Sequence, residues 1–154
     1  MLTKDLITKN IDISKNIFIA YSGGSDSTAL IHLLSSIKVD KNTKVKAIHI
    51  NHNLSKNSLL WEIQCREQCS KLGIDLIVES VEIKSDGGGL EAASRKARYK
   101  IFERLLDKDD QILLGHHSDD VTETLFMRLL RGTGPDGMEG PKLKRFLGQG
   151  VLVR

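Results

Sequence analysis

The sequence predicts an α/β fold, with a doubly wound, mostly parallel sheet of about five strands and helices on both faces. Four short apolar runs recur along the 154 residues, and each precedes a segment of helical periodicity, which is the pattern of a repeated β-α unit. The runs are apolar on both sides, so we expect helices to cover both faces of the sheet. Right-handed crossovers between such strands make them parallel.

The predicted strands and helices alternate from residue 16 onward. The strand-like runs are NIFIAY (16–21), KVKAIHI (44–50), DLIVESV (75–81) and QILLGHH (111–117). The apolar stripes of the helices after the first three runs are Leu30, Leu33, Leu34 and Ile37, then Trp61, Cys65, Cys69 and Leu72, then Leu90, Ala93, Ala97, Ile101 and Leu105. A fourth helical pattern follows the last run.

We expect residues 1–154 to form one domain that is the N-terminal piece of a longer chain. A hydrophobic content of 40% excludes a disordered or fibrous class. The glycine-rich segment 132–150 contains both prolines and predicts a flexible loop. The chain then stops at VLVR (151–154), the start of an apparent fifth strand, and such an ending would be unusual for a complete protein.

Composition narrows the location and the chemistry. No apolar run approaches the roughly 18 residues that span a bilayer, and the N-terminus lacks the apolar segment of a signal peptide, so we expect a cytoplasmic protein with no membrane partner. Cys65 and Cys69 share an apolar helical stripe, and we expect buried thiols that take no part in chemistry.

The net charge is only +3, but basic residues gather towards the C-terminal end, namely Arg128, Arg131, Lys142, Lys144, Arg145 and Arg154. A solvated surface and a nucleic-acid partner are both compatible with that cluster.

The segment SGGSDS, between the first predicted strand and its helix, has the composition of a phosphate-binding loop. Its residues are Ser22, Gly23, Gly24, Ser25, Asp26 and Ser27. Unpaired amides and the positive dipole end of a helix attract anions, glycines let the backbone curl around them, and serine hydroxyls add donors. The loop has neither the ending of a Walker loop nor the spacing of a dinucleotide fingerprint.

Asp26 adds a metal to this prediction. A carboxylate beside phosphates repels them unless a divalent cation lies between, so Asp26 indicates Mg²⁺ that bridges phosphate oxygens. The alternative is that Ser25 and Asp26 only cap the helix. The two preceding glycines and the strand before them favour the phosphate interpretation.

Further polar residues follow the second run and occupy the third helix. His49 and His52 could bind adenine, phosphate or metal, or be strand-end residues that backbone groups satisfy. Glu91, Arg95 and Arg98 share a helix face through four- and three-residue spacings. One interpretation is a surface pair of Glu91 with Arg95; the other is that an arginine, Arg98 in preference to Arg95, binds phosphate or a substrate carboxylate.

The stretch LGHHSDDVTETLFMRLLRGTG (114–134) places histidines at the end of the fourth run and acidic residues in the first turns of the next helix. Asp120 and Glu123 face the same way, and paired carboxylates there could hold a cationic amine and remove its proton. Helix capping is the alternative for Asp119 and Asp120, and it explains Glu123 less well.

The strand, the SGGSDS loop and the helix resemble the pyrophosphate loop of the N-type ATP pyrophosphatases, the PP-loop superfamily with its Rossmann-like fold. With HINHNLS, LEAASRKARY and GHHSDDVTETLFMRLLRGTGPDGM, in this order, the loop resembles the tRNA(Ile)-lysidine synthetase family. The resemblance implies a carbon-nitrogen ligase that adenylates the wobble cytidine of tRNA(Ile) with ATP, after which free L-lysine displaces AMP to give lysidine. It implies ATP and Mg²⁺ as cofactors and tRNA(Ile) and L-lysine as partners, and a homodimer is compatible with it.

The resemblance also implies roles for single residues. Ser22 to Ser27 would hold ATP together with His49, and Asp26 would bind the magnesium. The residues that match positions for lysine binding and catalysis in the family are Arg98, His116, Asp120 and Glu123. Further candidates for binding lysine or tRNA are Arg95 and Arg131. A lysine ammonium, with a pKa of about 10.4, must lose a proton before it attacks, which nearby carboxylates could arrange.

Three other interpretations stay open. A related tRNA-thiolating enzyme would need a cysteine pair at the site, whereas both cysteines here are expected in the core. A dinuclear metal phosphoesterase would use as ligands His49, His52, His116, His117, Asp119 and Asp120. It would leave SGGSDS without a purpose. A nucleotide-binding module without catalysis would bind ATP and release no pyrophosphate.

Overall fold

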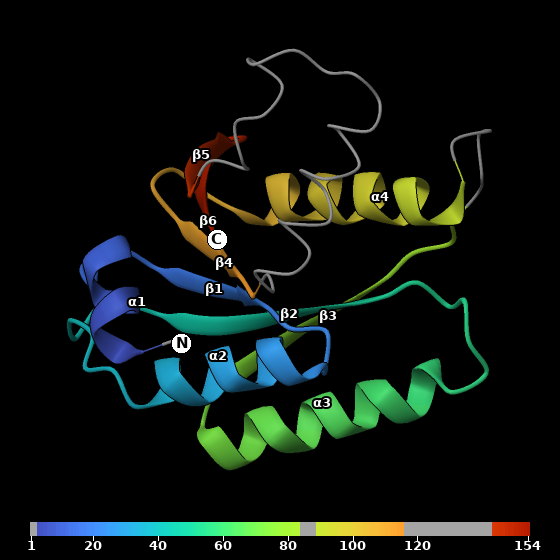
Figure 1. The fold of residues 1–154 in the computed structure, drawn as a ribbon, viewed down its shortest axis with the longest axis horizontal. Helices are drawn as coiled ribbons and strands as arrows, with labels where there is room; N and C mark the ends of the chain where they lie inside the picture. Colours follow the sequence, from blue (N-terminus) through green and yellow to red (C-terminus); the bar gives the residue numbers. More distant parts are fainter. Residues whose placement is uncertain (1–2, 84–88, 116–142) are drawn as a thin grey trace, which may run out of the picture.

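The computed structural model describes residues 3–83, 89–115 and 143–154. Within them, six strands form one sheet and four helices pack around it (Figure 1). The strands are β1 (Ile17–Ala20), β2 (Val45–Asn51), β3 (Asp75–Ser80), β4 (Gln111–Leu114), β5 (Lys144–Leu147) and β6 (Gly150–Val153). The helices are α1 (Lys4–Asn10), α2 (Ser25–Ser35), α3 (Ser58–Leu72) and α4 (Leu90–Leu105). None of these described helices has the length and apolarity needed to cross a membrane.

The strands are ordered β3-β2-β1-β4-β6-β5. All described neighbours pair in parallel except β5, which runs antiparallel to β6. The predicted doubly wound, mostly parallel sheet is therefore confirmed, with one strand more than expected. That strand, β5, forms within the segment 132–150 that the sequence predicts as a loop, and it turns into β6 through Gly148 at φ +58°. Residues 132–142 of that segment lie outside the described residues.

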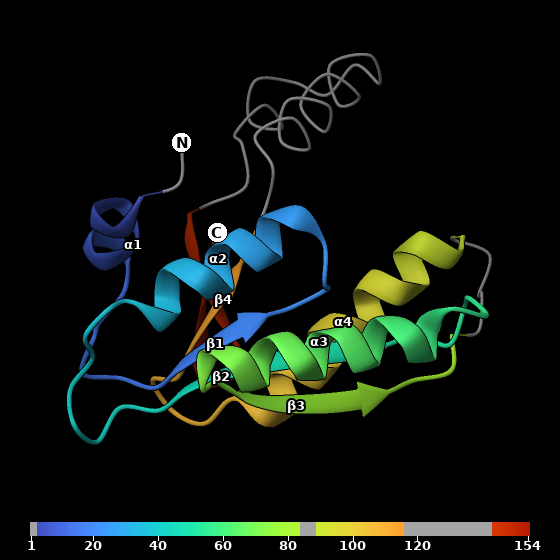
Figure 2. The same ribbon diagram turned by 90° about the horizontal axis from the view of Figure 1, so that it is seen from below.

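Each face of the sheet has its own apolar core, and β1 contributes to both. Ile17 and Ile19 pack with buried residues of α1, α2 and α3, whereas Phe18 packs on the opposite face with Phe102 of α4. In Figure 1, α2 and α3 lie below the strands and α4 lies above them. Figure 2 shows the same layers from the side of α2 and α3. The prediction of strands buried on both faces is thus confirmed for the central strands β1 and β4, whereas β3, at the edge of the sheet, has no fully buried residue.

Two apolar side chains that the sequence places in buried helical stripes are exposed instead. Trp61 is 51% exposed and Leu90 is 53% exposed. Leu90 is the first residue of α4, and α3 begins beyond the carboxyl end of β2, so the first turns of both helices project past the strands (Figure 1). Further along α3, where the helix covers the sheet, Cys65 and Cys69 are fully buried as expected.

The amino ends of the strands form one rim of the sheet, which we call the amino edge, and the carboxyl ends form the other, the carboxyl edge. At the amino edge, the Gln111 side-chain amide donates to the Asp12 carbonyl and accepts from the Asp12 N–H, both at 2.8 Å. At the carboxyl edge, β1 is the switch point, because the chain leaves it for β2 on one side and later returns to β4 on the other. Open α/β sheets bind ligands outside the carboxyl ends of strands at such a point.

Candidate functional site

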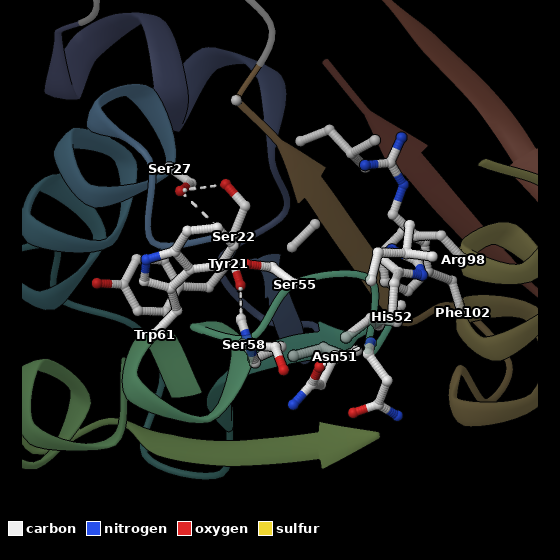
Figure 3. Close-up of a pocket in the computed structure, with 18 residues that line it drawn as sticks. Tyr21, Ser22, Ser27, Asn51, His52, Ser55, Ser58, Trp61, Arg98 and Phe102 are labelled. Carbon is white, nitrogen blue, oxygen red and sulfur yellow. Dashed lines mark hydrogen bonds between the residues drawn. The ribbon is translucent and has the colours of Figure 1, made fainter. Parts of the chain in front are cut away.

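A cavity of about 350 Å³ opens at this carboxyl edge (Figure 3). Tyr21 and Ser22 reach it from the end of β1, and Gly115 from the end of β4, while the end of β2 and the loop after it supply another side. Trp61 of α3 and Arg98 of α4 line it from opposite faces of the sheet. Its size is within the range of about 300 to 1,000 Å³ that is typical of small-molecule sites.

The SGGSDS loop is held in shape by its own serines. Ser27 Oγ donates to the Gly24 carbonyl at 3.0 Å and accepts from the Ser22 N–H at 3.3 Å. Because the Ser27 proton is used in this way, the 3.0 Å contact between the two hydroxyls has Ser22 Oγ as donor. Ser22 Oγ also accepts from the Gly24 N–H at 3.3 Å. Ser27 is therefore buried and holds the loop in place through these hydrogen bonds, whereas the side chains or backbone of Ser22, Gly23, Gly24 and Ser25 are exposed.

Two close approaches explain glycines at the site. Gly23 has φ +82°, a conformation that side chains disfavour, and a Cβ there would lie 3.0 Å from Cys65 Sγ. A Cβ on Gly115 would lie 3.2 Å from the carbonyl carbon of Asp26. The end of β4 is thus packed directly against the first turn of α2.

The start of α2 fits a phosphate and magnesium site. Its N-cap is Gly24, with no side-chain capping bond, so Ser25 and Asp26 do not take the capping role that the alternative interpretation required. Asp26 is half-buried in the first turn, and its Oδ1 accepts from Ser25 Oγ at 3.4 Å. First-turn amides have no partner within a helix. Backbone donors and a carboxylate therefore stand together, as phosphate oxygens bridged by Mg²⁺ require.

His49, at the end of β2, is buried and tied to β1. Its Nδ1 lies 2.9 Å from the carbonyl oxygen of Tyr21. A carbonyl can only accept, so Nδ1 carries the proton, and Nε2 is the acceptor of the neutral ring. Cys65 Sγ lies 3.6 Å from the same Nδ1. Burial, with smaller effects of Cys69 and Glu62, raises the pKa of the Cys65 thiol to about 11, so it stays protonated.

His52 and Arg98 line the cavity on the side away from the loop (Figure 3). Within the described part of the chain, His52 Nδ1 and Arg98 Nε are buried and have no hydrogen-bond partner. Burial lowers the pKa of His52, and the charge of Arg98 and then His49 lower it further. Burial likewise lowers the pKa of Arg98. Because a buried polar group without a partner costs about 1 to 3 kcal/mol, this side fits a ligand that brings oxygen acceptors.

The structure separates the two arginines that share a helix face in the sequence. Arg98 lines the cavity, whereas Arg95 is exposed, with its guanidinium carbon 5.7 Å from the centroid of the Tyr99 ring. Among the described residues Arg95 forms no ion pair with Glu91, so the surface-pair interpretation finds no support.

Several predicted site residues lie outside the described residues. They are His116, Asp120, Glu123 and Arg131, together with His117 and Asp119. Gly115, the last described residue before them, lines the cavity. In the described ranges, no three His, Cys, Asp or Glu side chains gather where they could hold a metal ion.

Sequence reasoning missed some residues of the cavity. Trp61 was expected in the core, but it lines the cavity, as do Asn51 and Phe102. A signal exists for Phe102, which follows Arg98 by four residues on the same helix face. The sequence carries no such signal for Trp61, because the projection of α3 past the sheet depends on the tertiary structure.

The doubly wound sheet, with a glycine and serine loop leading into a helix N-terminus at the switch point, defines a nucleotide-binding α/β protein. The family model of the PP-loop domain matches residues 3–154, and the chain belongs to this family. The resemblance of the SGGSDS loop to the N-type ATP pyrophosphatases is therefore confirmed.

Curated relatives carry the name tRNA(Ile)-lysidine synthase. The chain is 43% identical over 137 residues to that of Alkalilimnicola ehrlichii, covering 88% of this chain and 31% of the relative. It is 41% identical to that of Legionella pneumophila strain Paris (91% and 32% covered) and 40% identical to that of Xanthomonas campestris pv. campestris strain 8004 (90% and 32% covered). The chain thus spans about a third of the length of these relatives.

A solved structure supports the fold. The chain resembles the U34-tRNA thiolase of Methanococcus maripaludis with a TM-score of 0.72, covering 97% of this chain and 56% of the thiolase. The sequence identity is 17%, so this likeness concerns the fold alone.

Proposed function

We propose that this chain is the catalytic domain of an enzyme that ligates L-lysine to the wobble cytidine of tRNA(Ile), with ATP converted to AMP and pyrophosphate. The observation that carries the proposal is the cavity with two different sides, the SGGSDS loop on one and the unpartnered nitrogens of His52 and Arg98 on the other. The relatives at 40 to 43% identity support the choice of reaction.

The loop side would bind the ATP phosphates. The backbone amides of the loop and the first turn of α2, with the exposed Ser25 hydroxyl, would donate to phosphate oxygens. Ser22 and Ser27 would keep the loop in shape, since their hydroxyls bond to each other. Asp26 would ligate Mg²⁺, which when bound neutralises phosphate charge. His49 would act through its bond to Tyr21, which positions the start of the loop.

The other side would bind the amino acid. Arg98 Nε and His52 Nδ1 offer hydrogen bonds to one anionic group, and we assign the α-carboxylate of lysine to them. By motif position, His116, Asp120 and Glu123 would surround the ε-amine, whose ammonium form must lose a proton before it attacks.

The reaction then has two steps. The carbonyl oxygen of the wobble cytidine attacks the α-phosphorus of ATP, and the bond to pyrophosphate breaks. The ε-amine, after its proton has passed to Asp120 or Glu123, attacks the activated carbonyl carbon, and the carbon-oxygen bond to AMP breaks. The cytidine must leave the stack of its loop to reach the cavity, as in most sequence-specific recognition of RNA. Such an enzyme would act in the cytoplasm, where these substrates occur.

The first experiment follows pyrophosphate release from ATP by the full-length protein with unmodified tRNA(Ile), with and without lysine. We expect release that requires this tRNA, and lysine on its wobble cytidine. Release without lysine incorporation but with sulfur incorporation would assign the protein to tRNA thiolation. Hydrolysis of phosphoesters without ATP, with bound transition metal, would identify a phosphoesterase.

A variant separates the two steps. Glu123→Gln should leave adenylation of the tRNA intact and impair lysine transfer, because only the second step needs a base for the amine. An equal loss of both steps would contradict a role confined to the amine.

A further inference from the structure

Three arginines surround one tyrosine on the α4 side of the sheet. The guanidinium carbon of Arg145 lies 5.0 Å from the centroid of the Tyr99 ring, and that of Arg95 lies 5.7 Å from it. Arg154 donates to the Tyr99 hydroxyl at 3.4 Å. We call Arg95, Tyr99, Arg145 and Arg154 the Tyr99 cluster.

The cluster is assembled by two separate parts of the fold. On α4, Arg95 precedes Tyr99 by four residues, so both lie on one helix face. On the β5–β6 hairpin, Arg145 pairs with Leu152, whose side chain packs in the core beneath α4. Residues directly opposite each other in an antiparallel pair have their side chains on the same face of the sheet, so Arg145 points to the same side as Leu152. Formation of β5, which the sequence did not predict, therefore brings Arg145 to Tyr99 of α4.

Two charges of the cluster, those of Arg95 and Arg145, are not balanced by any described acidic residue. Arg95 and Arg145 are exposed, and neither forms an ion pair with any described residue. Burial would raise the pKa of Tyr99, but hydrogen bonds from Arg154 and Arg145 and the nearby positive charges lower it overall. Guanidinium groups held on an aromatic ring keep their N–H donors for a further acceptor.

The cluster adjoins the cavity. The Tyr99 ring packs edge-on against Phe102, with centroids 6.2 Å apart and planes at 73°, and Phe102 lines the cavity together with Arg98. An anionic polymer that crosses the cluster would thus pass beside the cavity in which the chemistry is proposed.

We propose that the Tyr99 cluster binds the phosphodiester backbone of RNA next to the nucleotide that enters the cavity. This inference rests on the proposed function, since it assigns the RNA partner to a surface. Planar guanidinium groups suit phosphate oxygens, and a polyanion relieves the repulsion between Arg95 and Arg145, which lie on the same ring. The catalytic proposal uses neither Arg145 nor Arg154. Arg95, a candidate for binding either lysine or tRNA, is assigned here to RNA.

The test is a double variant, Arg95→Gln with Arg145→Gln, in the full-length protein. Binding of an unmodified tRNA(Ile) transcript is measured by fluorescence anisotropy across a range of salt concentrations. We expect affinity to fall about tenfold, and the slope of log affinity against log salt to shrink by about 2, one for each lost phosphate contact. ATP affinity should be unchanged, because both side chains are exposed and outside the cavity. Thermal stability should fall only slightly, because each substitution removes one exposed contact with the Tyr99 ring.

The matched control is Lys38→Gln with Lys41→Gln, which removes the same charge from the exposed connection between α2 and β2. It should leave the RNA affinity and the salt slope as in the unchanged protein. Equal losses in both double variants, or none in the arginine variant, would overturn the proposal. So would binding of anionic lipid vesicles that depends on the same arginines while RNA binding does not. RNA binding that depends on the cluster, without lysine ligation, would refute the proposed function and leave the surface standing.

Discussion

The imidazole of His49 is hydrogen-bonded through Nδ1 to the carbonyl oxygen of Tyr21, at 2.9 Å. The bond joins β2, near its carboxyl end, to the residue that precedes the SGGSDS loop, and both residues line the cavity. His49 is only 6% exposed, so we infer that its main role is structural, namely to fix the position of the loop. A direct contact with the nucleotide would have to use Nε2.

Substitutions of His49 distinguish these two roles. His49→Asn places an amide nitrogen near the position of Nδ1, whereas His49→Gln places one nearer to Nε2. We expect His49→Asn to retain most ATP affinity and His49→Gln to lose about tenfold, since a lost hydrogen bond to a buried carbonyl costs about 1 to 3 kcal/mol. Calorimetric titration with MgATP measures both. The opposite order would assign His49 to direct contact.

Gly23→Ala should weaken both stability and ATP binding. The positive φ costs about 1 to 2 kcal/mol for an L side chain, and the new methyl group would press on Cys65 Sγ at 3.0 Å. Gly73→Ala is the matched control, because Gly73 has φ +66° with nothing near its Cβ position and lies at the end of α3. It should lose similar stability in thermal unfolding and keep its ATP affinity. Loss of ATP affinity in both variants would show that unfolding, rather than the loop, is responsible.

Asp26→Asn should abolish the part of ATP binding that depends on Mg²⁺. The amide keeps the shape of the side chain but removes the charge that a divalent cation requires. ATP affinity is measured with Mg²⁺ and with a chelator, and only the first should fall. Asp5→Asn removes an acidic residue from the first turn of α1 and serves as the control. Unchanged affinity of Asp26→Asn in Mg²⁺ would refute the metal role.

The buried thiols predict how stability depends on pH. Burial is the main cause that raises the pKa of both Cys65 and Cys69 from 9.0 to about 11. Between these values the unfolded chain releases thiol protons that the folded chain keeps, so the free energy of unfolding falls as the pH rises from 9 to 11. Urea unfolding at pH 8, 9.5 and 10.5 should show this fall, and Cys65→Ala with Cys69→Ala should reduce its slope. An unchanged slope in the double variant would place the thiols in contact with water.

Local patterns were enough to predict most of the fold. The strand, the loop and the helix from Ile17 to Ser35 follow one another without a gap, and each is encoded by its own residues, so this strand-loop-helix unit could be predicted. Strand β5 could not, because it is an edge strand with Lys144, Arg145 and Phe146 exposed, and only its pairing with β6 makes it a strand.

The far side of the cavity depends on contacts between distant parts of the chain. The helix spacing put Arg95 and Arg98 on one face and did not by itself separate them; the structure places Arg98, the preferred candidate, in the cavity. That His52 would share this side with Arg98 could not be read from either segment alone. The position of Trp61 at the cavity had the same cause, since it depends on where α3 begins relative to the sheet (Figure 1).

The charge of Arg98 acts on His52, and this predicts how the protonation of His52 responds to substitution. Burial is the main reason that the pKa of His52 lies below 6.5, and the charge of Arg98 comes next. Arg98→Gln should therefore raise the pKa of His52 without restoring it fully, whereas the exposed Arg95→Gln should leave it unchanged. As the pH falls below about 6.5 the unfolded chain takes up a proton that folded His52 resists, so stability falls, and it should fall less in Arg98→Gln.

The titration of His52 also reports on the ligand. A carboxylate bound between His52 and Arg98 favours the imidazolium, so L-lysine should raise the pKa of His52 in an NMR titration of the full-length protein. Lysinamide has the same amines without the carboxylate and should have no such effect. If both compounds shift the pKa equally, the anionic group is not what this side of the cavity recognises. If neither shifts it, lysine binds elsewhere.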